Sequence, residues 1–93
     1  MATVSPAPAN LTGTAVSSYN VTLNWADHSA DEQGFKIEYW NGLSWVQIGT
    51  IGANATSVNI SGTSSRGTYW FRMRAYNGTA NTAYSNSVSV TTP

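Results

Sequence analysis

Apolar and polar side chains alternate with a period of two between Thr68 and Asn77. One face of this segment carries Tyr69, Phe71, Met73 and Ala75. The other face carries Trp70, Arg72, Arg74 and Tyr76. Because successive side chains of a β-strand point to opposite faces of its sheet, this alternation predicts a strand with one buried face and one exposed face.

Shorter segments with the same alternation occur along the rest of the chain. An edge strand is expected after the two prolines Pro6 and Pro8, and further strands are expected at 19–25, 35–40, 45–51, 57–61 and about 83–91. Turn-forming residues separate these segments, and Asn41-Gly42 favours a tight turn between antiparallel strands. Seven short strands, with no helical pattern and no long repeat, predict an all-β fold of two antiparallel sheets packed as a sandwich.

The inward positions of these strands form the predicted core, with Trp25 as the large aromatic side chain at its centre. Packing of this core and hydrogen bonds must supply the stability, because the chain has no cysteine and therefore no disulfide. The residues expected in the core are Leu11, Val21, Leu23, Trp25, Phe35, Ile37, Tyr39, Ile48, Val58, Ile60, Tyr69, Phe71, Met73, Val88 and Val90.

Composition excludes several classes of function. The chain has 93 residues, enough for one domain, and its four basic and four acidic residues give a net charge of zero. A neutral chain lacks the overall attraction that basic proteins have for nucleic acids and anionic membranes. No apolar run approaches the roughly 20 residues that span a bilayer. We therefore expect neither a nucleic acid nor a membrane as a partner.

Six segments, taken in order, resemble the fibronectin type III domain, and the resemblance covers essentially the whole chain. They are PAPANL (6–11), VTLNW (21–25), GFKIEY (34–39), WVQI (45–48), YWFRMRAYN (69–77) and SNSVSV (85–90). The resemblance implies a seven-stranded immunoglobulin-like β-sandwich, a single domain over 1–93 with an ordered core at about 6–92. It also implies that Tyr69 is the tyrosine-corner residue, whose hydroxyl reaches the backbone of the preceding turn. Thr63-Ser-Ser65 stands where the family usually has Leu-x-Pro, which suggests a looser or shortened turn.

The chain looks most similar to the modules of bacterial secreted enzymes and surface proteins. This similarity implies a non-catalytic spacer or weak interaction module of a modular extracellular protein. Such a module is a monomer without a cofactor, with termini at opposite ends and the neighbouring domains of its parent chain as partners. No secretion signal is visible, so the extracellular or cell-surface location is implied by the resemblance alone. An engineered fibronectin-type binding scaffold is the alternative, although loops 26–34, 52–56 and 77–82 lack aromatic side chains.

One predicted loop holds the residues that could carry out chemistry, namely Asp27, His28, Ser29, Asp31 and Glu32. Neighbouring residues cannot face one another as nucleophile, base and orienting acid, so we expect no enzymatic activity. The three acidic side chains could supply oxygen atoms to Ca²⁺, but their spacing matches no defined calcium loop. Zinc is disfavoured because the chain has one histidine and no thiolate. We expect these side chains to stabilise a turn, with no metal bound.

The exposed face of strands 35–40 and 68–77 is where a binding function is expected. The candidate residues are Trp40, Trp70, Arg72, Arg74 and Tyr76. If the two strands are neighbours, Lys36 and Glu38 share this face, which could bind a protein or could bind a polysaccharide by stacking on sugar rings. The alternative is that cross-strand aromatic pairs and a pair between Glu38 and an arginine only reinforce the sheet. Trp40 and Trp45 would likewise clasp the hairpin between them.

Overall fold

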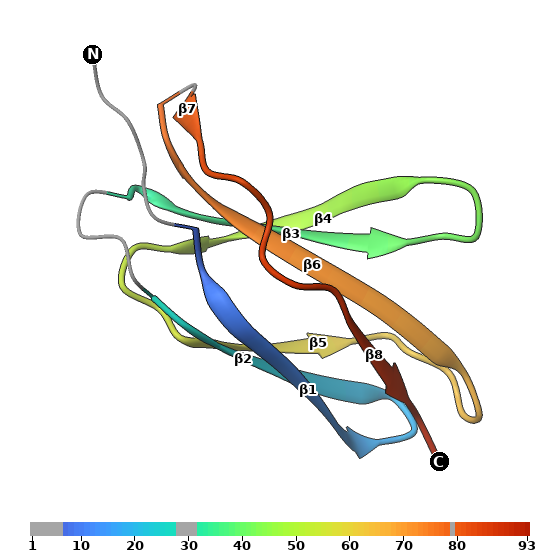
Figure 1. Ribbon diagram of the computed structural model, residues 1–93. Coiled ribbons are helices and arrows are strands. Elements are labelled where there is room, and N and C mark those ends of the chain that lie inside the picture. Colours follow the sequence, from blue (N-terminus) through green and yellow to red (C-terminus); the bar gives the residue numbers. More distant parts are fainter. Residues whose placement is uncertain (1–6, 28–31, 79) are drawn as a thin grey trace.

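The computed structural model describes residues 7–27, 32–78 and 80–93. Within these residues, two antiparallel β-sheets pack face to face (Figure 1). The three-stranded sheet has the order β1 (Ala9–Ser17), β2 (Asn20–Ala26) and β5 (Ser57–Ser61). The five-stranded sheet has the order β4 (Trp45–Gly52), β3 (Gly34–Trp40) and β6 (Thr68–Asn77), and both β7 (Ala80–Asn81) and β8 (Val88–Thr91) pair with β6. The prediction of an all-β sandwich of two antiparallel sheets is confirmed.

The register of β3 on β6 determines both faces of the five-stranded sheet. The pairs that face the other sheet are Phe35–Ala75, Ile37–Met73 and Tyr39–Phe71. The pairs that face outward are Lys36–Arg74 and Glu38–Arg72. The side-chain alternation of each strand is thus matched across the pair, and the buried apolar positions fall on one side. The described residues contain no helix that is long and apolar enough to cross a membrane.

The core lies between the two sheets. Its buried side chains are Leu11, Val21, Leu23, Trp25, Phe35, Ile37, Phe71, Met73, Ala75 and Val90. Tyr39, Val58, Ile60, Tyr69 and Val88 are partly buried and pack against this group. Trp25 meets Phe35 edge to face, with ring centroids 5.4 Å apart. Such an arrangement suits the charge distribution of aromatic rings and ties one sheet to the other.

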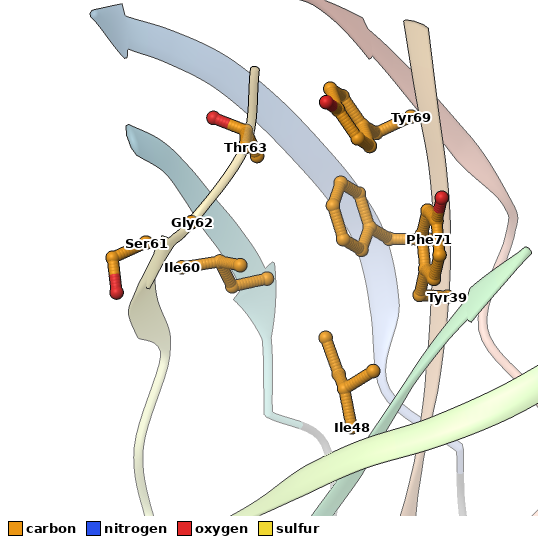
Figure 2. Close-up of a pocket in the computed structure, with 8 residues that line it drawn as sticks. All are labelled: Tyr39, Ile48, Ile60, Ser61, Gly62, Thr63, Tyr69 and Phe71. Atoms are coloured by element: carbon orange, nitrogen blue, oxygen red, sulfur yellow. The ribbon is translucent and has the colours of Figure 1, made fainter. Parts of the chain in front are cut away.

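The assignment of Ile48 to the core is wrong, because its side chain is 45% exposed. Opposite β3, Gln47 pairs with Glu38 and Gly49 pairs with Ile37, so Ile48 is the extra residue of a β-bulge. β4 is also the edge strand of its sheet. Figure 2 shows the Ile48 side chain directed into a cavity of about 360 Å³ where the edges of the two sheets part. Among the described strands, only β3 pairs with β4, so the other edge of β4 is not covered by a strand.

The carboxyl-terminal strand is shorter than the predicted segment 83–91, because β8 begins at Val88. Upstream of β8, side-chain hydroxyls take the place of backbone carbonyls as acceptors for β6. The Ala75 amide donates to Thr82 Oγ1 at 3.1 Å, and the Met73 amide donates to Ser85 Oγ at 3.1 Å. The segment 82–87 therefore stays attached to β6 without forming a regular ladder.

The tyrosine-corner contact implied by the resemblance is present. The Tyr69 hydroxyl accepts a hydrogen bond from the Ser64 amide at 2.7 Å. The same turn is held by Thr63, whose hydroxyl donates to the Ser18 carbonyl at 3.0 Å, and by Thr92, which donates to the Ser64 carbonyl. Hydroxyl hydrogen bonds thus secure this turn at the place where the family usually has leucine and proline.

Candidate functional site

Three tryptophans form a row across the outer face of the five-stranded sheet. Trp45 on β4 pairs with Trp40 on β3, and Trp70 lies on the adjacent strand β6. The rings of Trp40 and Trp45 are tilted by 59° with centroids 5.6 Å apart. Together with Trp70 they line a cavity of about 270 Å³. We call these three residues the tryptophan cluster.

The position of the tryptophan cluster follows from the hairpin between β3 and β4. The Asn41 side chain accepts hydrogen bonds from the amides of Leu43 and Ser44 at 2.8 and 2.9 Å, and the Asn41 amide donates to the Ser44 carbonyl at 3.1 Å. The positive φ of Gly42, 99°, completes this turn. Because the turn brings Trp40 and Trp45 into register, their contact is a clasp of the hairpin, as expected. Their rings also remain accessible, since Trp40 is 37% exposed and Trp70 is 45% exposed.

Arg72 lies beside the tryptophan cluster and is held from several directions. Its Nε and Nη2 atoms each lie 2.8 Å from Glu38 Oε1. Its guanidinium lies 4.4 Å from the centroid of the Trp45 ring and 3.7 Å from that of Tyr84. The Tyr84 hydroxyl completes the arrangement by donating to Glu38 Oε2 at 2.8 Å. Arg72 therefore acts as a fixed support under Trp45.

Tyr84 was not among the candidate residues. Burial, the hydrogen bond to Glu38 and the negative charge of that carboxylate raise the pKa of Tyr84 above its usual 10.0, against the opposing effect of two arginines. Strand alternation would place Tyr84 on the same inward face as Val88 and Val90. It instead lies on the outer face, because residues 82–87 do not form a regular strand. The periodicity of the sequence therefore could not identify it.

Lys36 and Arg74 occupy the next row of the outer face. They pair directly across β3 and β6. Lys36 Nζ donates to Asn81 Oδ1 at 2.8 Å and lies 5.1 Å from the centroid of the Tyr76 ring. The Arg74 guanidinium lies 4.6 Å from the centroid of the Tyr84 ring. Its Nε atom is buried and has no hydrogen-bond acceptor among the described residues.

The candidate face is therefore divided. Trp40 and Trp70 come together, and Trp45 joins them although the sequence indicated only a structural role for it. Tyr76 is six residues beyond Trp70 on β6, a separation of about 20 Å along the strand. It lies instead beside Lys36. The structure thus places the aromatic candidates at two ends of one face, with the arginines between them.

The cavity shown in Figure 2 lies between the edges of the two sheets and not on the outer face. Its lining residues are Tyr39, Ile48, Ile60, Ser61, Gly62, Thr63, Tyr69 and Phe71. A second cavity of about 210 Å³ continues it along β4 and β5. Both arise where the edges of the two sheets part and the bulge at Ile48 lies. Since tyrosine is the only titratable residue type in either lining, this groove provides no acid–base pair for chemistry.

The acidic loop falls partly outside the described residues, and His28, Ser29 and Asp31 lie there. Glu32 is buried, and its Oε2 atom accepts a hydrogen bond from the Asn54 amide at 2.9 Å. Burial raises the pKa of Glu32, but hydrogen bonds from the Asn54 amide, from its own amide and from Asp27 outweigh this effect and lower the pKa below 4.5. The described residues contain no group of three or more side chains able to hold a metal ion.

Comparison with known proteins decides the family. The family model of the fibronectin type III domain matches residues 6–91. The chain belongs to this family. Fibronectin type III domains are generally non-catalytic modules of multidomain chains. The structure is similar to that of a β-1,2-glucanase from Parabacteroides distasonis, with a TM-score of 0.82, 15% sequence identity and coverage of 97% of this chain and 13% of that chain.

Two sequence relatives are much longer than this fibronectin type III domain. A Kelch domain-containing protein of Saccharolobus solfataricus is 29% identical over 86 residues, which are 92% of this chain and 12% of the relative. Contactin-3 of Homo sapiens is 28% identical over an alignment of 94 positions, which covers 92% of this chain and 9% of the relative. The chain thus spans about a tenth of the length of these relatives.

Proposed function

We propose that this fibronectin type III domain is a non-catalytic spacer in a modular extracellular protein of bacterial origin. The positions of its two ends support this role most directly. β1 runs from Ala9 to Ser17, and the hydroxyl of Ser18 donates to the Pro93 carbonyl at 3.1 Å. The carboxyl end of the chain therefore lies beside the far end of β1 (Figure 1). The ends of β1 pair with Ala26 and Asn20 of β2, which are six residues apart, so this end lies about 20 Å from Ala9.

Hydrogen bonds between the two sheets support a rigid rather than a flexible spacer. The Asn86 side chain accepts from the Leu11 amide and donates to the Leu11 carbonyl, both at 2.9 Å. Gly13 lies so close to Val90 that an added Cβ would come within 2.3 Å of its Cγ2 atom. β1 is thereby packed tightly against β8. Neighbouring domains attached at the two ends would be held apart at a nearly constant distance.

The proposed setting rests on resemblance. The chain looks most similar to the modules of bacterial secreted enzymes and surface proteins. This chain covers 13% of the bacterial glucanase chain to which its structure is similar. That glucanase illustrates how a sandwich of this kind occurs as a small part of a larger enzyme chain. In that setting the enzymatic activity would belong to the parent chain.

Single-molecule energy transfer tests the spacer role. The sequence contains no cysteine, so Ala7→Cys and Pro93→Cys can be labelled without competing thiols. We expect a single narrow distance distribution near 30 Å that persists up to cooperative unfolding. A flexible chain of 93 residues would instead give a broad distribution centred at about 55 Å. A broad distribution under native conditions would rule out the rigid spacer.

A second candidate function, carbohydrate binding, is favoured by the tryptophan cluster. Three indole rings around one cavity of about 270 Å³ form a platform on which a sugar ring can stack. The core does not need these exposed rings. The test is retention on insoluble polysaccharides, with Trp40→Ala and Trp70→Ala expected to abolish it. Tyr19→Ala is the matched control, because Tyr19 is 65% exposed and lies in the turn between β1 and β2, away from this face.

A further inference from the structure

The outer face of the five-stranded sheet carries a surplus of positive charge, although the chain as a whole is neutral. Three of the four basic residues of the sequence, Lys36, Arg72 and Arg74, lie on this face. Glu38 is the acidic residue paired among them. Three positive charges and one negative charge leave this face with a surplus of two.

The surplus belongs to Lys36 and Arg74. Arg72 is neutralised by Glu38 in an ion pair of 2.8 Å. Lys36 and Arg74 stand directly opposite each other in the register, where like charges destabilise a sheet. Within the described part of the chain, neither has a carboxylate within 4.0 Å. The buried Nε atom of Arg74 also has no acceptor there. An anionic group placed at the accessible part of the Arg74 guanidinium would relieve the repulsion between these two cations.

Arg74 belongs to the pair of cations Lys36 and Arg74, Trp70 belongs to the tryptophan cluster, and both residues lie on β6. Trp70 and Arg74 are four residues apart on β6, so both point outward and lie about 14 Å from each other. A polymer lying along β6 would cover both features at once. A pyranose ring fits the tryptophan cluster because the electron-rich face of an indole attracts the C–H groups of a sugar. A carboxylate is the group expected at Arg74, because a guanidinium forms stronger hydrogen bonds with an anionic acceptor than with a neutral one.

We propose, on the basis of the carbohydrate binding suggested above, that this face binds an acidic polysaccharide. Pyranose rings rest on Trp40, Trp45 and Trp70, and a carboxylate of a following uronic acid unit pairs with Arg74 and Lys36. The face is ready for such a ligand, because Glu38 and Tyr84 already fix Arg72 beneath Trp45. Little side-chain freedom is lost on binding to a platform that is already held in place.

The experiment compares three polymers by isothermal titration calorimetry at low salt: polygalacturonate, its fully methyl-esterified form and polyglutamate. We expect polygalacturonate to bind best, with its affinity falling as salt screens the charges. Trp70→Ala and Arg74→Gln should each weaken this binding at least tenfold, whereas Tyr19→Ala should leave it unchanged. Arg74→Gln removes a like-charge pair and also the contact of the guanidinium with the Tyr84 ring. These effects oppose each other, so the melting temperature of this variant should stay close to that of the native chain.

Each alternative outcome has a definite meaning. Equal binding of the methyl ester would overturn the acidic preference while leaving carbohydrate binding intact. Equal binding of polyglutamate would show that charge alone is recognised and would overturn the saccharide assignment. Binding of neither sugar polymer would overturn both. If Trp70→Ala lowers the melting temperature, Arg74→Gln decides the result, because its affinity loss is expected without a loss of stability.

Discussion

Replacing Glu38 with glutamine removes the charge that holds the outer face together and keeps the shape of the side chain. The carboxylate contacts Arg72 through one oxygen and the Tyr84 hydroxyl through the other. In the variant, the guanidinium of Arg72 remains between Trp45 and Tyr84 without a negative partner. The support beneath the tryptophan cluster should therefore weaken.

The expected cost can be bracketed from burial. Removing one partner of a fully buried ion pair costs about 3–5 kcal/mol, whereas an exposed pair contributes about 0–1 kcal/mol. The Glu38 side chain is 9% exposed and the Arg72 side chain is 24% exposed, so this pair lies between the two limits. We expect Glu38→Gln to lower the free energy of unfolding by about 2 kcal/mol, or the melting temperature by about 8–16 °C.

Chemical denaturation of a double-mutant cycle measures this coupling. The cycle comprises the native chain, Glu38→Gln, Arg72→Met and the double variant, and its interaction energy should be about 1–3 kcal/mol. Gln47→Ala, at the position opposite Glu38 on β4, is the control for a change on the same exposed face. An effect of Glu38→Gln below about 0.5 kcal/mol, typical of plain surface sites, would refute the role given to this carboxylate.

Three further predictions concern the core and the acidic loop. Trp25→Ala should cost about 3–5 kcal/mol in chemical denaturation, because its buried ring packs on the core; a loss under about 1 kcal/mol would place the core elsewhere. Ile48→Ala should cost much less than Ile37→Ala, for which about 2–5 kcal/mol is expected, and equal costs would contradict the bulge. Because the folded-state pKa of Glu32 is lowered, its stabilisation is present above pH 4.5 and is lost as pH falls through the folded value. Glu32→Gln should therefore be less stable than the native chain at pH 7 and lose less stability between pH 5 and 3; parallel pH profiles would exclude this.

The alternation in the sequence predicted the two faces of β6 and β3, because side-chain direction in a paired strand depends only on local periodicity. It could not predict the exposure of Ile48, since a bulge arises from the register of one strand on its partner. The same limit explains Tyr84. Its position follows from the hydroxyls of Thr82 and Ser85, which replace a regular ladder along β6.

The sequence predicted only part of the candidate site, because local periodicity gives the face on which a side chain lies but not its neighbours on that face. Trp70 and Trp40 could be placed on one face from their strands alone, and Tyr76 could be placed on the same face. Distance along the strand then separates Tyr76 from the others. Trp45 joins the cluster through its cross-strand pair with Trp40. Whether Arg74 has a carboxylate partner depends on where every acidic side chain lies in the folded chain. A local sequence pattern does not contain this information.

Nuclear magnetic resonance of the indole N–H groups, during titration with an oligogalacturonate, tests the binding face most directly. The sequence has four tryptophans, of which three form the tryptophan cluster and Trp25 lies in the core as an internal reference. We expect the signals of Trp40, Trp45 and Trp70 to shift with one common affinity while that of Trp25 stays in place. Four unmoved signals, at ligand concentrations that saturate known uronate-binding proteins, would contradict an acidic-saccharide site on this face.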